Sequence, residues 1–253
     1  MKRSFVRGLW GDLVDNRRGV TDRREKVVKD IERVVNSPYP MEFVTYVFGR
    51  DNAALLEQYN LPYVLISEES IQWDMRDELY RHKLEIMKCA MRDYDRIVCL
   101  DWDCILTKPL PANVWDILEQ KDVVQANLFL YRTKKCLWRK EDVRKTCNGG
   151  FVYMADKSIP DQFIKNWEEL RSWALDIQEK RRVRGLELRC REKSLMFDDE
   201  PSISKFIDDY SKGWPGVDEY WQRFEPSICL LRKKSAFSKE QNESKDACFM
   251  HML

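Results

Sequence analysis

No stretch of this sequence comes near the roughly 20 apolar residues that a membrane-spanning helix requires. The first residues, Met1-Lys2-Arg3-Ser4-Phe5, are followed by Arg7 and Asp12 and lack the apolar core of a secretory signal. None of the 8 cysteines belongs to a C-x-x-C pair, the close spacing that zinc sites usually show. We therefore expect a cytoplasmic protein whose cysteines are free thiols in a reducing compartment.

An excess of charge of one sign, internal repeats and low-complexity tracts are absent as well. Lysine and arginine together number 44 and aspartate and glutamate 43, but the near balance hides an uneven distribution along the chain. The hydrophobic content of 43% is enough to build one large core. We expect a single domain that spans residues 1–253, with an irregular carboxyl-terminal part.

Short segments rich in β-branched and aromatic residues alternate along the chain with segments whose apolar residues recur at helical spacing. Strands are predicted at 5–11, 42–48, 63–66, 96–100, 123–130 and 150–154, and helices at 22–35, 51–56, 79–92, 114–118, 159–178 and 202–210. This alternation predicts an α/β fold with a mostly parallel central sheet and helices on both faces. Ligands bind such sheets at the carboxyl ends of the strands.

Two aspartates, Asp101 and Asp103, follow the apolar strand predicted at 96–100. Alternate residues of a strand point the same way, so both carboxylates are expected to face one divalent cation, with Trp102 pointing away. Carboxylate oxygens suit magnesium or manganese, and such an ion neutralises a nucleotide diphosphate. Two aspartates at this spacing are also common in solvated turns, and only their place at a strand end favours the metal site.

The stretch from Tyr80-Arg81-His82-Lys83-Leu84 to Ile97-Val98-Cys99-Leu100-Asp101-Trp102-Asp103 resembles the GT-A glycosyltransferases. The closest pattern is that of the glycogenin-like and galactosyltransferase-like members. The resemblance implies a GT-A (Rossmann-like) fold and a D-x-D motif that holds Mn²⁺ (or Mg²⁺) and a nucleotide-sugar donor, expected to be a UDP-sugar. Arg81, Lys83 and Asp101 look like residues that contact this donor. The plain alternative for Arg81 and Lys83 is an ordinary solvated helix charge.

Further motifs carry the same resemblance. Asn148, Gly149 and Gly150 look like the glycine-bearing segment that lines the sugar pocket, where glycine lets backbone approach a ligand. Asp199 and Glu200 look like the acidic pair beside the transferred sugar and are the catalytic candidates. The alternatives are a simple turn before a strand for the glycines and helix capping for the acidic pair.

The remaining candidates lie at the two ends of the sequence. His251 looks like the third metal ligand of the family, and a structural histidine is the alternative. Trp10 could stack on the nucleotide base and Arg17 could meet its phosphate. By the resemblance, residues 1–104 form the nucleotide-sugar-binding half and residues 105–253 the acceptor-binding half.

The resemblance implies transfer of a hexose or pentose to a hydroxyl acceptor. A bound metal acts as a Lewis acid on the leaving diphosphate. A nearby carboxylate, Asp199 before Glu200, can stabilise the oxocarbenium-like state. The glycogenin-like features favour retention of configuration. In a retaining enzyme the leaving phosphate can take the proton from the hydroxyl group of the acceptor, whereas an inverting enzyme would use one of these carboxylates as the base.

Three basic segments lie in the acceptor-binding half. Residues 132–145, 179–193 and 232–239 carry net charges of +5, +4 and +4. A surface glycan is the expected acceptor. The alternative is DNA with hydroxymethylated bases, as in phage-type DNA glycosyltransferases, which the basic segments could follow along the phosphate backbone.

Two rival classes fit less well. A nucleotidyltransferase needs a glycine-rich phosphate loop after the first strand, and Gly8-Leu9-Trp10-Gly11 is too sparse for one. A non-enzymatic nucleic-acid-binding module explains the basic segments but leaves the D-x-D motif, the acidic pair and the late histidine without a purpose.

Overall fold

The computed structural model describes residues 1–15, 21–71, 76–119, 123–127, 147–184, 202–203, 230–232 and 249–251. Its centre is a sheet of 6 strands in the order β5-β4-β1-β6-β9-β8. The strands are β1 (Arg3–Leu9), β4 (Phe43–Phe48), β5 (Tyr63–Ser67), β6 (Arg96–Leu100), β8 (Val123–Asn127) and β9 (Cys147–Met154). Strands β5, β4, β1 and β6 are parallel, whereas β9 runs antiparallel to both β6 and β8.

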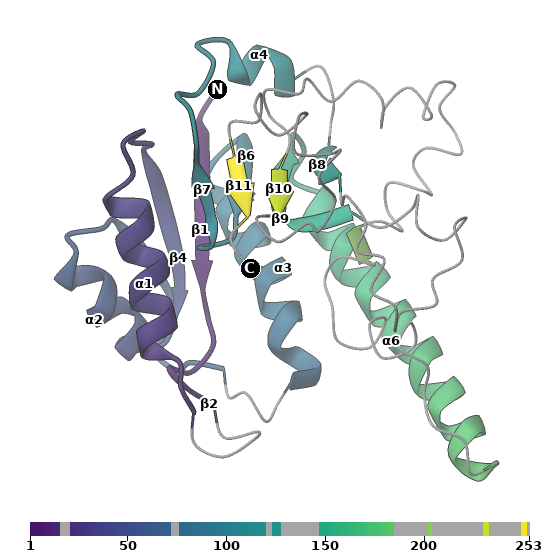
Figure 1. The fold of residues 1–253 in the computed structure, drawn as a ribbon. Helices are drawn as coiled ribbons and strands as arrows, with labels where there is room; N and C mark the ends of the chain where they lie inside the picture. The colour runs from purple at the N-terminus through teal and green to yellow at the C-terminus, as the bar shows by residue number, and fades with distance from the viewer. Residues whose placement is uncertain are drawn as a thin grey trace.

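Helices cover both faces of this sheet, which confirms the α/β fold with a mostly parallel sheet that the sequence predicts. The helices are α1 (Arg24–Val35), α2 (Arg50–Gln58), α3 (Arg76–Asp93), α4 (Val114–Leu118) and α6 (Ile159–Val183). In Figure 1, α1 and α2 lie to the left of the sheet and α3 and α6 to its right. No described helix has the length and apolarity needed to cross a membrane.

Alternation along each strand supplies the two faces with apolar side chains. Val6 of β1 and Tyr46 of β4 are buried in the core under α3 and α6. Leu9 and Val47, which lie an odd number of residues away on the same strands, are buried in the core under α1 and α2. The sequence therefore places a hydrophobic layer on each side of the sheet.

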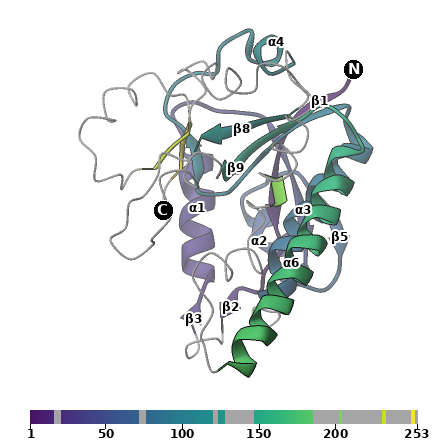
Figure 2. The same cartoon turned by 90° about the vertical axis from the view of Figure 1, so that its right-hand side faces the viewer.

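Helix α6 lies against α3 and extends well beyond it, as Figure 2 shows. Phe163 and Trp167 of α6 are buried in the core that Leu84 of α3 also enters. At the rim of this contact, Lys88 Nζ of α3 lies 2.6 Å from Asp161 Oδ1 of α6. Apolar packing supplies most of the stability of such a contact, because partly exposed ion pairs contribute about 0–1 kcal/mol.

Some elements have no counterpart among those predicted from the sequence. Strands β7 (Cys104–Leu106), β10 (Leu230–Arg232) and β11 (Phe249–His251) form a second sheet in the order β10-β11-β7. Strands β2 (Val14–Asp15) and β3 (Thr21–Asp22) pair antiparallel. Of the helix predicted at 202–210, the structure describes residues 202–203, which are helical.

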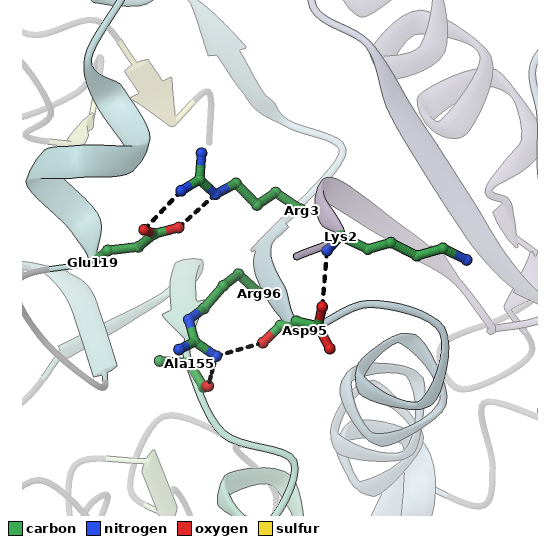
Figure 3. A network of polar contacts seen from close by, with 6 residues as sticks. All are labelled: Lys2, Arg3, Asp95, Arg96, Glu119 and Ala155. Carbon is green, nitrogen blue, oxygen red and sulfur yellow. Dashed lines mark hydrogen bonds and ion pairs between the residues drawn. The ribbon is translucent and has the colours of Figure 1, made fainter.

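The amino-terminal edge of the main sheet is closed by a network of polar contacts (Figure 3). The backbone N–H of Lys2 donates to Asp95 Oδ2 at 2.8 Å, and Arg3 pairs with Glu119 at 2.5 Å. Arg96 donates to the carbonyl oxygen of Ala155, just past the end of β9. The side chains of Asp95, Arg3 and Arg96 therefore all contact other groups of the same chain.

Candidate functional site

The two aspartates of the D-x-D motif lie in a turn at the carboxyl end of β6. This strand ends at Leu100, and the backbone N–H of Cys104 donates to the carbonyl oxygen of Asp101 at 3.0 Å. Residues 101–103 are therefore outside the strand, and the strand alternation that we used to aim both carboxylates does not apply to them. The shape of the turn determines where Asp101 and Asp103 point.

Trp102 points away from the site into the core, as predicted. Its side chain is only 8% exposed and packs with Leu9, Ile31 and other residues under α1 and α2. Its ring lies edge-on to Phe43, with ring centroids 5.7 Å apart. This buried indole anchors the turn, whereas Asp101 and Asp103 are both partly exposed.

Lys83 of α3 reaches the motif. Its Nζ lies 2.7 Å from Oδ1 of Asp101, and its side chain is 5% exposed. Arg81 lies two residues earlier and therefore on another side of the helix. Its guanidinium lies 3.1 Å from Glu85 and 3.8 Å from Glu168 of α6. Of the two predicted donor contacts, the structure brings Lys83 to the motif and turns Arg81 towards α6.

The glycine-bearing segment meets the motif through β9. The backbone N–H of Asp101 donates to the carbonyl oxygen of Gly150 at 3.0 Å, and Gly150 is buried. Asn148 and Gly149 lie in the same strand, and Asn148 is opposite Ala126 of β8. Two sequence motifs that are almost fifty positions apart thus share a backbone hydrogen bond.

Arg7 is a residue of this region that the sequence-based reasoning missed. Its side chain is buried, and it donates from Nη1 to the carbonyl oxygen of Asp101 at 2.5 Å and from Nη2 to that of Cys104 at 2.8 Å. Burial lowers the pKa of Arg7, while the nearby carboxylates of Asp101 and Asp103 act in the opposite direction. A charge inside the otherwise apolar run at 5–9 was the signal that could have revealed it.

A further carboxylate, Asp30 of α1, lies close enough to Asp103 to feel its charge. Burial raises the pKa of Asp30, and Lys26 and Arg33 act against this rise while Asp103 adds to it. Arg33 Nη1 donates to Asp30 Oδ1 at 2.8 Å. Asp101 therefore contacts Lys83 of α3, and on the other side of the sheet the charge of Asp103 acts on Asp30 of α1.

Strand β11 brings the end of the chain to the motif. It pairs antiparallel with β7, and His251 is the partner of Cys104, the residue directly after Asp103. The backbone of His251 is described and its side chain is not. Within the described part of the chain, no three His, Cys, Asp or Glu side chains form a group that could hold a metal ion.

The donor set of the turn fits a hard divalent cation. Asp101 and Asp103 supply carboxylate oxygens, both are partly exposed, and the turn that carries them is fixed through the backbone of Asp101. Magnesium and manganese are commonly held by one or two carboxylates together with phosphate oxygens of a ligand. Two protein carboxylates at the edge of the sheet therefore match an ion that is shared with a diphosphate.

The loop after β1 lies at the same edge of the sheet as the motif. The carbonyl oxygen of Trp10 accepts the backbone N–H of Ile71 at 2.9 Å, and Trp10 is half-buried. A Cβ atom on Gly8 would lie 2.8 Å from Ile86 of α3 and 3.1 Å from the Trp10 ring. Glycine at position 8 therefore allows this ring to pack close to β1.

Other predicted site residues lie outside the described residues. They are Arg17, Asp199 and Glu200, together with the basic segment 132–145. The two other basic segments are described only at 179–184 and at Arg232. In the described part of the first, Lys180 pairs with Asp176 at 2.6 Å and Arg182 with Glu179 at 2.8 Å.

Comparison with solved structures shows a likeness of fold. No protein-family model matches this sequence, and no curated protein matches it in sequence. The crystal structure of mouse xyloside xylosyltransferase 1 in its apo form aligns with 98% of this chain and 97% of its own, with 11% identity and a TM-score of 0.49. At this identity and score the likeness bears on neither substrate nor mechanism, and the fold class rests on the strand order described above.

Proposed function

We propose that this chain is a metal-dependent glycosyltransferase that moves a sugar from a nucleotide-diphosphate sugar to a hydroxyl acceptor. By the sequence resemblance, this donor is a UDP-sugar. One observation carries the proposal: Lys83 and Gly150, from two of the motifs expected to bind the donor, both contact Asp101. Its carboxylate pairs with Lys83 at 2.7 Å and its backbone N–H donates to Gly150. This convergence occurs at the carboxyl edge of a mostly parallel sheet, where such folds bind ligands.

The chemistry of the residues supports this reaction. A divalent cation held by Asp101 and Asp103 would supply Lewis-acid stabilisation of the leaving diphosphate. Lys83 places a buried ammonium beside the same carboxylate, where it can bind a phosphate oxygen of the donor. Because the ammonium is shielded from water, its attraction to a diphosphate is stronger than that of an exposed lysine.

The proposal extends to Asp199 and Glu200, which lie outside the described residues, and to His251, of which the backbone alone is described. Asp199, with Glu200 as the second choice, stabilises positive charge on the transferred sugar, and His251 completes the ligands of the cation. Both roles come from the sequence resemblance. The backbone pairing of His251 in β11 with Cys104 in β7 supports the role of His251, because Cys104 directly follows Asp103 in the sequence.

The acceptor we propose is a surface glycan. DNA with hydroxymethylated bases is the alternative, and it draws its support from the basic segments at 132–145, 179–193 and 232–239. In the described part of the second segment, Lys180 and Arg182 are already paired with acidic neighbours on α6. This internal pairing weakens the case for a phosphate backbone along that part of the helix.

The test is sugar release from a panel of donors. The intact protein is stripped of metal with a chelator and offered UDP-hexoses and UDP-pentoses, one at a time, with and without Mn²⁺. We expect slow release of UDP from at least one donor that depends on Mn²⁺ and falls about 100-fold or more in Asp103→Asn. Asp95→Asn, an aspartate at the opposite end of β6, is the matched control.

Three outcomes would contradict the proposal. They are no turnover of any donor, turnover that is unchanged by the chelator, and equal activity in Asp103→Asn and in the wild type. Salt-sensitive binding to DNA in the absence of turnover would favour the nucleic-acid-binding module instead.

A further inference from the structure

Arg7 is a buried cation in the middle of a strand, and burial of a guanidinium is unfavourable unless its donors are bound. It lies in β1 between Val6 and Gly8, and its side chain is among the largest that are fully buried. The pKa of Arg7 is lowered by this burial. A fold that keeps a charge in such a place gains something that an apolar residue would not supply.

The contacts of Arg7 lie at both ends of one short segment. One nitrogen of the guanidinium donates to the carbonyl oxygen of Asp101 and another to that of Cys104, at 2.5 and 2.8 Å. These carbonyls belong to the first and last residues of the turn that carries both carboxylates. The planar, rigid fork of arginine therefore fixes the span of this turn.

Two aromatic rings hold the guanidinium itself. Its central carbon lies 5.1 Å from the ring centroid of Phe43 and 5.3 Å from that of Trp102. Trp102 belongs to the turn, so the side chain of Arg7 contacts both the backbone of the turn and the buried ring of Trp102. These cation–π contacts restrict the guanidinium to one orientation.

On the basis of the proposed function, we infer that Arg7 is a positioning residue that shapes the D-W-D turn for a divalent cation. Its hydrogen bonds go to carbonyl oxygens, so it holds the turn without using the carboxylates of Asp101 and Asp103 as acceptors. Lysine at this position keeps the charge but has a single ammonium group, which cannot reproduce the planar fork.

The chain offers a matched control at the other end of β6. Arg96 donates to two backbone carbonyls as well, those of Asp95 and Ala155 (Figure 3). This arginine is partly buried and lies at the amino end of the strand. It makes the same kind of contact as Arg7 at the end of the strand that lacks the D-W-D turn.

The experiment compares Arg7→Lys with Arg96→Lys in the intact protein. Mn²⁺ affinity is measured from the free-ion signal in electron paramagnetic resonance, and hydrogen exchange of the Cys104 amide is followed in metal-free protein. In Arg7→Lys we expect a Kd for Mn²⁺ about tenfold higher, as for loss of residues that orient metal ligands, and amide exchange at least about tenfold faster. In Arg96→Lys the Kd for Mn²⁺ and the Cys104 exchange rate should both stay within about twofold of wild type, even if its Tm falls as much as that of Arg7→Lys.

The possible outcomes separate the role of Arg7 from the metal site of the proposed function. Wild-type protein that binds Mn²⁺, together with an Arg7→Lys variant that matches it in both measurements, overturns the role of Arg7. Equal weakening in Arg96→Lys overturns it too, because the effect is then a general loss of stability. Wild-type protein that fails to bind Mn²⁺, with faster Cys104 exchange only in Arg7→Lys, refutes the metal site of the proposed function and leaves Arg7 as the residue that shapes the turn.

A second variant tests the same role if Arg7→Lys does not fold. Phe43→Leu keeps the arginine and removes one of the two rings beside it. We expect this variant to raise the Kd for Mn²⁺ about threefold, between wild type and Arg7→Lys. An unchanged Kd and unchanged Cys104 exchange in folded Phe43→Leu would count against the positioning role.

Discussion

Strand β6 has an aspartate directly before it and another directly after it, and the two differ in what they bind. At the amino end, Asp95 accepts the backbone N–H of Lys2, and the neighbouring charges bind protein groups (Figure 3). At the carboxyl end, the backbone of Asp101 is bound by Arg7 and Gly150, and its partly exposed carboxylate meets Lys83.

Under the proposed function, the same residue types serve stability at one end of the strand and ligand binding at the other. At the amino end the carboxylate itself is the acceptor that ties elements together. At the carboxyl end the backbone and Trp102 tie the elements together, and the side chains of Asp101 and Asp103 stay partly exposed. Ligand sites in α/β folds occur at this second edge because the strands all end there.

The largest expected effect separates the two aspartates that flank β6. Asp101→Asn removes a negative charge from the proposed cation site, so we expect kcat/KM for the donor to fall about 100-fold or more. Asp95→Asn removes a charge that accepts a backbone hydrogen bond and should change kcat/KM less than about twofold. Steady-state kinetics on both variants tests the comparison, and equal losses in the two would break it.

The next effect concerns two lysines of helix α3. Lys83→Met removes the ammonium beside Asp101, and we expect kcat/KM to fall about tenfold, equivalent to roughly 1.4 kcal/mol of transition-state stabilisation. Lys88→Met breaks the pair with Asp161 between α3 and α6 and should leave turnover unchanged. Should both variants lose activity in proportion to their loss of thermal stability, Lys83 has a structural role only.

A smaller effect is expected at Gly8, near the carboxyl end of β1. In Gly8→Ala the new Cβ lies 2.8 Å from Ile86 and 3.1 Å from the ring of Trp10, so these side chains must shift. We expect KM for the donor to rise a fewfold and stability to fall by about 1–3 kcal/mol. Ser4→Ala in the same strand is the control. An unchanged KM would mean that Trp10 has no part in donor binding.

The smallest effect is a pair of pH dependences with opposite signs. Burial raises the pKa of Asp30, so its charged form disfavours the fold at neutral pH, and this penalty disappears as pH falls below the ordinary value of 3.8. The backbone N–H of Lys2 lowers the pKa of Asp95, so its charged form stabilises the fold at neutral pH, and that contribution is lost in acid.

Unfolding by urea at pH 7 and near pH 3 tests both directions. Asp30→Asn should be slightly more stable than wild type at pH 7, and Asp95→Asn slightly less stable. Both differences should shrink in acid, as the carboxyls become protonated in the wild type. If both substitutions change the free energy of unfolding in the same direction at pH 7, the two carboxylates do not have opposite electrostatic effects on stability.

Much of the fold was predictable because its signals are local. The strand at 96–100 has the predicted bounds, and the helix at 79–92 lies within α3. In both segments, the pattern of apolar residues is the one expected for that type of element, and it extends over enough residues to be recognised. Strands β7, β10 and β11 have three residues each, too few for a period, and they depend on pairing between distant parts of the chain.

The candidate site could be predicted as a list of residues, but not as an arrangement in space. Asp101, Lys83 and Gly150 could be named from motifs, but their hydrogen bonds depend on packing between α3, β6 and β9. Helical spacing alone indicates that Arg81 and Lys83 cannot face the same point. Arg7 escaped because its partners are backbone carbonyls, which carry no sequence signal.

The most direct test of a cation site at the D-W-D turn is the position of manganese in crystals soaked with Mn²⁺ and UDP, read from anomalous scattering. We predict one strong peak next to the Asp103 carboxylate, at the carboxyl end of β6, and the loss of that peak in Asp103→Asn. A peak at another place on the protein, or none at the turn at saturating Mn²⁺, would contradict it.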